Sequence, residues 1–208
     1  MGRLRGPDSS FERAAMVRGV GAVCGIDEAG RGPWAGPVVA AAVILDLKNV
    51  PKGIDDSKRL TPAERGELFI AIRRSAAVGI GIAGVGRIDR DNILAASLWA
   101  MTEAVRLLPI RPALALIDGN RAPSLECETR TIVAGDQQSL SIAAASIVAK
   151  VVRDRIMTAL NHQFPGYNFA RHKGYGTVAH QKALARLGPS AQHRRSFAPI
   201  RALLAQIA

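Results

Sequence analysis

The sequence has little cysteine, no long apolar run and no acidic residue near its C-terminal end. Its 208 residues include two cysteines, Cys24 and Cys127, which excludes a disulfide framework or a cysteine-built zinc site and fits a reducing compartment. The longest apolar run, residues 38–45, is far too short to cross a bilayer. Residues 1–16 contain no apolar signal core, so we expect a cytoplasmic protein without membrane association.

Positive charge is concentrated at one end of the chain. The net charge is +11, from 28 Lys and Arg against 17 Asp and Glu, and the last acidic residue is Asp154. Residues 155–208 hold eight basic residues and all four histidines. A near-neutral body with a basic C-terminal quarter is typical of a protein that binds the phosphate backbone of nucleic acid. Charge alone also fits a merely soluble cationic surface.

Apolar periodicity and turn residues predict an α/β fold. Strands are expected at 20–27, 38–45, 78–85, 114–117 and 129–133, the first two joined as a hairpin by a Gly/Pro-rich turn. Helices are expected after a capping box at 61–64, at 91–108, 141–160 and 177–187, and from about Pro199. Strands alternate with helices through the first two-thirds, and helices dominate the end. The sequence therefore predicts one α/β sheet domain with a basic helical region after it.

One glycine motif is misleading. Residues 79–84 read GIGIAG, which matches the spaced glycines of a dinucleotide-binding loop, and Glu103 lies where a ribose-binding acid would be expected. Those glycines should follow a strand and open a helix. Here they lie inside the predicted strand, where glycine more often marks close backbone approach. We therefore reject a dehydrogenase.

Four acidic residues follow apolar segments. Asp27 and Glu28 end the first predicted strand, Asp118 ends the strand at 114–117, and Asp136 precedes the long Ala-rich helix. Ligands of open α/β sheets bind at the carboxyl ends of strands. Carboxylates meeting there would repel one another, and hard cations such as Mg²⁺ or Mn²⁺ would relieve that repulsion. Two such ions about 4 Å apart can hydrolyse a phosphodiester.

Each acid has a simpler interpretation when taken alone. Asp118 precedes Gly119 and could form a turn, and Asp136 could cap a helix. Asp27 and Glu28 could pair with Arg31. Only the set of four together with the basic C-terminal region favours catalysis.

Several short motifs occur along the chain in a defined order. The most specific is GIDEAGRGP at 25–33, continued by AGPVV at 35–39. Others are DSK at 56–58, IDG at 117–119, GD at 135–136, SIAAASIVAK at 141–150, RD at 153–154, HKGYGT at 172–177 and HRRSF at 193–197. Together and in this order, the motifs resemble the ribonuclease HII family, and the resemblance covers roughly residues 20–200. Trp34 stands where we expect a smaller residue such as leucine.

The resemblance implies a ribonuclease H-like α/β fold, in which helices flank a mixed five-stranded sheet and a helical extension follows. It divides the chain into an N-terminal tail (1–18), a catalytic domain (19–160) and a basic C-terminal helical region (161–208) that contacts nucleic acid. Whether the tail is flexible is left undecided by the sequence. It implies an endonuclease that hydrolyses RNA in RNA–DNA hybrids. It also implies nicking 5′ of single ribonucleotides in duplex DNA, and thus their removal.

By the same resemblance, Asp27, Glu28, Asp118 and Asp136 are the catalytic metal ligands for two Mg²⁺ or Mn²⁺ ions. Gly30, Arg31 and Gly32 are expected to read the ribose 2′-hydroxyl, which distinguishes RNA from DNA.

Three further side chains are expected to contact the substrate, each with an alternative. Tyr175 would stack on the sugar at the RNA–DNA junction, although a buried ring is the simpler reading. Lys58, beside Ser57, would approach a phosphate, although both could belong to a solvated loop. Lys150, His172 and His193 receive no role.

We expect a monomer. The sequence does not decide whether a sliding clamp is a partner. Two rivals also stay open: a hybrid-binding module without catalysis, and a resolvase- or transposase-like DNA nuclease.

Overall fold

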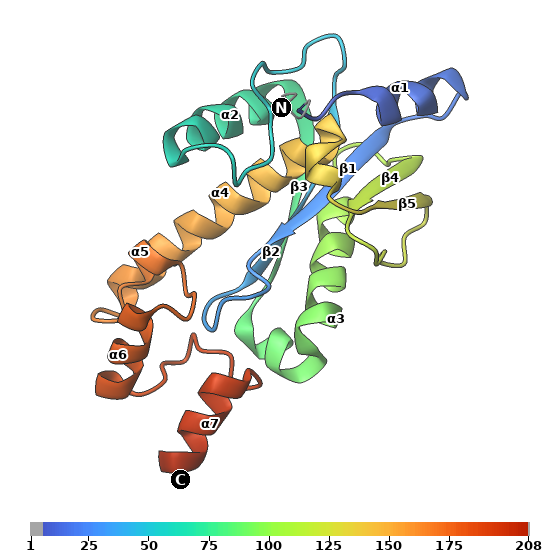
Figure 1. The fold of residues 1–208 in the computed structure, drawn as a ribbon. Coiled ribbons are helices and arrows are strands. Elements are labelled where there is room, and N and C mark those ends of the chain that lie inside the picture. Colours follow the sequence, from blue (N-terminus) through green and yellow to red (C-terminus); the bar gives the residue numbers. More distant parts are fainter. Residues whose placement is uncertain (1–5, 208) are drawn as a thin grey trace, which may run out of the picture.

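The longest apolar run of the sequence forms strand β2 (Val38–Leu45), which is buried on both faces. In this computed structural model, which describes residues 6–207, β2 lies within a five-stranded mixed sheet of order β3-β2-β1-β4-β5 (Figure 1). The other strands are β1 (Val23–Ala29), β3 (Ala76–Ala83), β4 (Leu114–Asp118) and β5 (Glu128–Ile132). All five expected strands are present, with ends shifted by a few residues.

Helices cover both faces of the sheet (Figure 1). Ala40 and Ala42 of β2 pack with α3 (Val85–Arg106), whereas Ala41 and Val43 pack with α4 (Leu140–Gln163) and α2 (Pro62–Ser75). Because side chains alternate along a strand, a strand buried on both faces must be continuously apolar. The rest of the helical structure consists of α1 (Ser10–Val17), η1 (Gly135–Gln137), α5 (Phe169–His172), α6 (Val178–Leu187) and α7 (Ala198–Ile207).

Glycine and alanine let the helices lie close to the sheet. A Cβ at Gly79 or Gly81 of β3 would collide with the carbonyl oxygens of Ala104 and Ala100 in α3. A Cβ at Gly25 of β1 would collide with the backbone of α4. The glycines at 79–84 therefore serve helix–sheet packing, in agreement with the rejection of a dinucleotide loop.

Asn92 explains why the sequence placed the start of the third helix too late. The helix begins at Val85, but Asn92 has a positive φ of 68° and interrupts it. Its side-chain Oδ1 accepts hydrogen bonds from the amides of Leu94 and Ala95, at 2.9 and 3.1 Å. Asn92 thus acts as an internal N-cap, and the expected boundary near Asp91 corresponds to this second start.

Part of the expected tail at residues 1–18 is an ordered helix. Residues 1–5 lie outside the described residues, but α1 packs against the sheet through Phe11 and Ala15. Glu12 is buried, and its Oε1 accepts hydrogen bonds from Ser139 Oγ (2.7 Å) and the amide of Ser141 (2.9 Å). These partners lie more than 120 residues away in the sequence, so no local pattern could have predicted this contact.

The helices after α4 have a small core of their own. Phe169, Leu184 and Ile200 pack with Met157 of α4 and with Ala35 from the turn between β1 and β2. This places the end of the chain beside that turn. Within residues 6–207, no helix is long and apolar enough to cross a membrane.

Candidate active site

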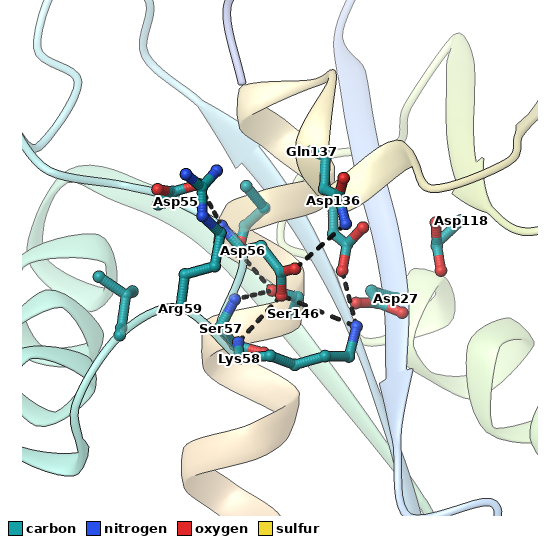
Figure 2. Close-up of polar contacts among 12 residues, drawn as sticks. Asp27, Asp55, Asp56, Ser57, Lys58, Arg59, Asp118, Asp136, Gln137 and Ser146 are labelled. Atoms are coloured by element: carbon teal, nitrogen blue, oxygen red, sulfur yellow. Dashed lines mark hydrogen bonds and ion pairs between the residues drawn. The ribbon is translucent and has the colours of Figure 1, made fainter. Parts of the chain in front are cut away.

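The acidic residues gather at one edge of the sheet. β1 and β4 are parallel neighbours, with Ile26 paired to Ile117, so Asp27 and Asp118 emerge side by side. Asp136 approaches from η1, which follows β5. Figure 2 shows Asp27 and Asp136 beside the Lys58 ammonium, with Asp118 farther to the right in the view.

Burial and mutual repulsion disfavour the charged forms of these carboxyls. The pKa of Asp27 is raised well above its usual value by burial and by the charges of Glu28, Asp118 and Asp136. Burial also raises the pKa of Glu28, with Asp118 adding to the effect and Arg31 opposing it. The pKa of Asp136 is raised by burial, against the opposing effect of Lys58. A cation at this edge would stabilise the ionised forms.

The donor atoms fit a hard divalent cation. One oxygen of each acid accepts a hydrogen bond: Asp27 from the Glu28 amide, Glu28 from Arg31, Asp118 from the Gly135 amide, and Asp136 from Lys58. The second oxygen of each accepts none from residues 6–207. Four such carboxylate oxygens are the ligands that Mg²⁺ and Mn²⁺ prefer.

The acidic side chains do not form a preformed binding site for one ion. Within the described part of the chain, no three acidic, histidine or cysteine side chains are arranged to hold one ion. Lys58 Nζ lies 2.9 Å from Asp136 Oδ2, so an ion that used this oxygen would have to displace the lysine.

The simpler interpretations of the acids hold only in part. Arg31 does pair with Glu28, at 3.3 Å. Asp136 does not cap α4, because the Ser139 side chain does so. Asp118 does precede a glycine with a positive φ of 92°, yet its carboxylate reaches across to Gly135 at 2.7 Å. The Asp118 side chain thus links the end of β4 to the start of η1.

Residues 55–58 bring Ser57 and Lys58 to the acids. The Ser57 amide donates to Ser146 Oγ of α4 at 3.4 Å, and Gln137 Nε2 donates to Asp56 Oδ2 at 3.4 Å (Figure 2). Ser57 is buried, so a fully solvated loop is wrong. The buried Asp56 was missed because its only sequence signal was membership of the DSK motif.

The Arg194 side chain is buried beneath the glycine turn. Its guanidinium has no carboxylate within ion-pair distance among residues 6–207 and donates to four backbone carbonyls, those of Gly30, Arg31, Gly36 and Pro37. Burial and the nearby charge of Arg153 lower its pKa to about 9, so it stays protonated at neutral pH. The charge pattern had counted Arg194 with the phosphate-binding surface, and this is wrong.

Arg153 completes the same support. It is buried on α4 and donates to the carbonyls of Ala35, Pro37 and Lys173 at 3.0 to 3.2 Å. A Cβ at Gly30, whose φ is +100°, would collide with the Arg153 side chain. The GRG turn therefore requires glycine at position 30 both for its backbone conformation and for the space that Arg153 fills.

Tyr175 is exposed, in contrast to the simpler reading of a buried ring. Its residue surface is 47% accessible, and it lies between two glycines with distinct packing. A Cβ at Gly174, with φ of +83°, would collide with the Ala35 carbonyl, and one at Gly176 would collide with the Trp34 indole. Trp34 thus supports the Tyr175 loop, which gives the unexpected tryptophan a packing role.

One cavity of about 430 Å³ unites these elements. Its wall includes all the expected site residues except Asp136, namely Asp27, Glu28, Gly30, Arg31, Gly32, Ser57, Lys58, Asp118 and Tyr175. Asp136 is linked to the wall by Lys58. Lys150 also lines the cavity, although its ammonium pairs with Asp154 at 2.8 Å.

Comparison with known proteins assigns the family. Residues 24–200 match the family model for ribonuclease HII. A ribonuclease HII from Azorhizobium caulinodans is 56% identical over 199 residues, which cover 96% of this chain and 77% of that protein. The crystal structure of ribonuclease H2 from Pyrococcus horikoshii OT3 superposes with a TM-score of 0.74 at 25% identity, covering 89% of this chain and 98% of the other.

A second similar structure is the PCNA:RNase HII complex from Archaeoglobus fulgidus, with a TM-score of 0.68 and 25% identity over 83% of this chain and 93% of that one. The chain therefore belongs to the ribonuclease HII family, whose members are divalent-metal-dependent ribonuclease H endonucleases acting on RNA–DNA hybrids.

Proposed function

We propose that this enzyme also nicks duplex DNA on the 5′ side of a single embedded ribonucleotide, by two-metal-ion catalysis, as the first step in ribonucleotide removal. The observation that carries the proposal is the cavity that joins the acidic edge to the glycine turn and to an exposed Tyr175. The acidic edge of this cavity supplies ligands for metal ions. The glycine turn and the exposed Tyr175 ring suit binding of a sugar.

The four carboxylates of Asp27, Glu28, Asp118 and Asp136 would hold the ions through the oxygens that accept no hydrogen bond. Two bound Mg²⁺ or Mn²⁺ ions would activate a water and stabilise the departing 3′-oxygen, which gives 3′-hydroxyl and 5′-phosphate ends. The protein's own contribution is to keep these acids in place by backbone and side-chain donors on their other oxygens.

Ribonucleotide selection is assigned to the turn at Gly30, Arg31 and Gly32. Without side chains at positions 30 and 32, the backbone can approach a sugar closely, and the 2′-hydroxyl is both donor and acceptor. Arg194 donates to the carbonyls of Gly30 and Arg31, and Arg153 donates to that of Pro37, where the turn leads into β2. The turn is therefore preorganised, and little ordering accompanies binding.

Tyr175 would stack on the deoxyribose at the junction, because its ring is exposed in the same cavity. Lys58, with an exposed side chain, would contact a backbone phosphate next to Ser57. The duplex would be held by exposed basic residues of the C-terminal region, so affinity should fall steeply with salt as counterions are released.

The test is a nicking assay on three labelled substrates: a duplex with one ribonucleotide, a continuous RNA–DNA hybrid and an all-DNA duplex. We expect 5′ nicking at the ribonucleotide in Mg²⁺ or Mn²⁺, none with EDTA and none on all-DNA. Asp118→Asn should lose most turnover but still bind the hybrid, whereas the exposed Asp46→Asn should behave as wild type. Cleavage of all-DNA would favour a resolvase-like nuclease, and full activity in EDTA would overturn the metal assignment.

We further propose that the enzyme acts as a cytoplasmic monomer. A sliding clamp is the partner to test, since the similar Archaeoglobus fulgidus structure is a complex with PCNA. Sedimentation and a pull-down with the clamp would address both points.

A further inference from the structure

Three histidines lie together beneath Tyr175. The rings of His172 and His180 stack with centroids 4.4 Å apart, and Nε2 of His180 lies 3.0 Å from Nε2 of His193. All three are buried. In the described part of the chain no metal-binding group of three such residues exists, so another reason is needed for placing imidazoles here.

The hydrogen bonds assign each proton. Nδ1 of His193 accepts from the backbone amide of Ser190 at 2.9 Å, so in the neutral ring the proton is on Nε2. That proton can only be donated to Nε2 of His180, which must then carry its own proton on Nδ1. From there it is donated to the carbonyl oxygen of Tyr175, at 2.9 Å.

The rings are neutral at physiological pH. Burial lowers the pKa of both His180 and His193 to about 4. A neutral pair has one proton between the facing nitrogens. Protonating His180 would put a hydrogen on both facing nitrogens and break their contact, whereas protonating His193 would put a hydrogen on its Nδ1 and break the bond from the Ser190 amide.

This chain of bonds holds the backbone of Tyr175 from both sides. The Tyr175 carbonyl accepts hydrogen bonds from His180 Nδ1 at 2.9 Å and from the Thr177 amide at 2.8 Å, and the Tyr175 amide donates to the carbonyl of His172 at 2.9 Å. The preceding peptide is also fixed, since the Gly174 amide donates to Nδ1 of His172 at 3.2 Å. The exposed ring of Tyr175 therefore extends from a rigid backbone.

We propose that His180 and His193 are positioning residues for Tyr175: a relay from the Ser190 amide through both imidazoles to the Tyr175 carbonyl fixes the ring that recognises the RNA–DNA junction. The proposal rests on the proposed role of Tyr175 in substrate selection. Neither histidine need touch the nucleic acid. Preorganisation of an aromatic contact lowers the entropy lost when the sugar binds.

The tautomers test the relay without any substitution. Long-range ¹H–¹⁵N spectra of the uniformly labelled full chain at pH 7 should show His180 as the Nδ1–H tautomer and His193 as the Nε2–H tautomer. Nε2–H on His180, or a charged ring on either residue, would overturn the assignment whatever the activity assays give.

The link to substrate choice is tested by comparing two substitutions at one position. His180→Leu removes the donor, and we expect it to lower kcat/KM about fivefold more on the single-ribonucleotide duplex than on the continuous hybrid. In His180→Asn, the amide nitrogen stands near the place of Nδ1, and we expect it to restore most of that selective loss. The exposed His162→Leu is the matched control.

A purely structural role would lower activity on both substrates equally, and that result would overturn the positioning role.

In a Tyr175→Ala background, His180→Leu should cause no further selective loss. If Tyr175→Ala itself is unselective, the proposed function of Tyr175 fails while the tautomer result still stands. Should His180→Leu not fold, His193→Leu is measured in the same way, with a smaller selective loss expected and equal losses again decisive against positioning.

Discussion

The Lys58 ammonium lies 2.9 Å from Oδ2 of Asp136, across 78 residues of sequence. This ion pair joins the DSK segment to the acidic edge of the sheet. Figure 2 shows Lys58 reaching Asp136 across the space beside Asp27. The proposed function gives the same lysine a second partner, a backbone phosphate of the substrate.

Lys58→Ala is expected to tighten divalent-ion binding to the substrate-free enzyme, because it frees Asp136 and removes a repelling charge. The Lys58 side chain is 77% exposed, so the gain should be modest, with Kd for Mn²⁺ falling about twofold to fivefold. KM for the hybrid should rise at the same time. Calorimetric titration and steady-state kinetics measure the two effects, with the exposed Lys48→Ala as control; weaker Mn²⁺ binding in the variant would contradict this account.

Arg194→Lys should destabilise the fold, because a compact ammonium cannot satisfy four separate carbonyls that a planar guanidinium reaches. We expect a loss of about 2–4 kcal/mol in the free energy of unfolding, since buried acceptors are left unpaired. Urea unfolding measures it. The neighbouring Arg195 is exposed, so Arg195→Lys should change stability little, and equal effects at both positions would argue against the support of the turn.

Glu12→Ala should cost about 2 kcal/mol, because Ser139 Oγ and the Ser141 amide lose their buried acceptor at the start of α4. Glu12→Gln keeps an acceptor oxygen and should cost much less. Chemical denaturation of both variants, with the exposed Glu67→Ala beside them, separates the buried hydrogen bonds from loss of surface charge. If Glu12→Ala matched Glu67→Ala, α1 would not be anchored as described.

The contribution of His180 and His193 to stability should fall as the pH drops from about 6.5 to about 4, whereas the raised carboxyl pKa values of Asp27, Glu28 and Asp136 act in the opposite direction. Burial lowers the pKa of His180 and His193 from 6.5 to about 4 in the folded protein, so in this window the unfolded chain binds protons that the folded chain does not. Each histidine should cost about 3 kcal/mol over the full window. The free energies of unfolding of wild type and His193→Gln, compared at pH 7, 6 and 5, test this. Between pH 7 and pH 5, stability should change in His193→Gln relative to wild type in the direction of a smaller acid loss, with the exposed His162→Gln as the control.

Local sequence features were enough for the strands, for most helices and for the acidic ends of β1 and β4. Their signals are short-range: the apolar run of β2, the Thr61 capping box that the structure contains, and acids placed directly after apolar segments. The order of the motifs was sufficient to identify the family. The helix at Asn92 was misplaced only because a side-chain cap can restart a helix within a continuous pattern.

The sequence by itself determined which acids stand at strand ends and that the C-terminal quarter is basic. Only the tertiary structure decided what those charges do, because burial and partners far along the chain set the state of each group. Arg194 and Glu12 look like surface charges in the sequence, yet both are buried and bonded to segments more than 100 residues away. The proton positions on His180 and His193 likewise depend on contacts that exist only once the chain has folded.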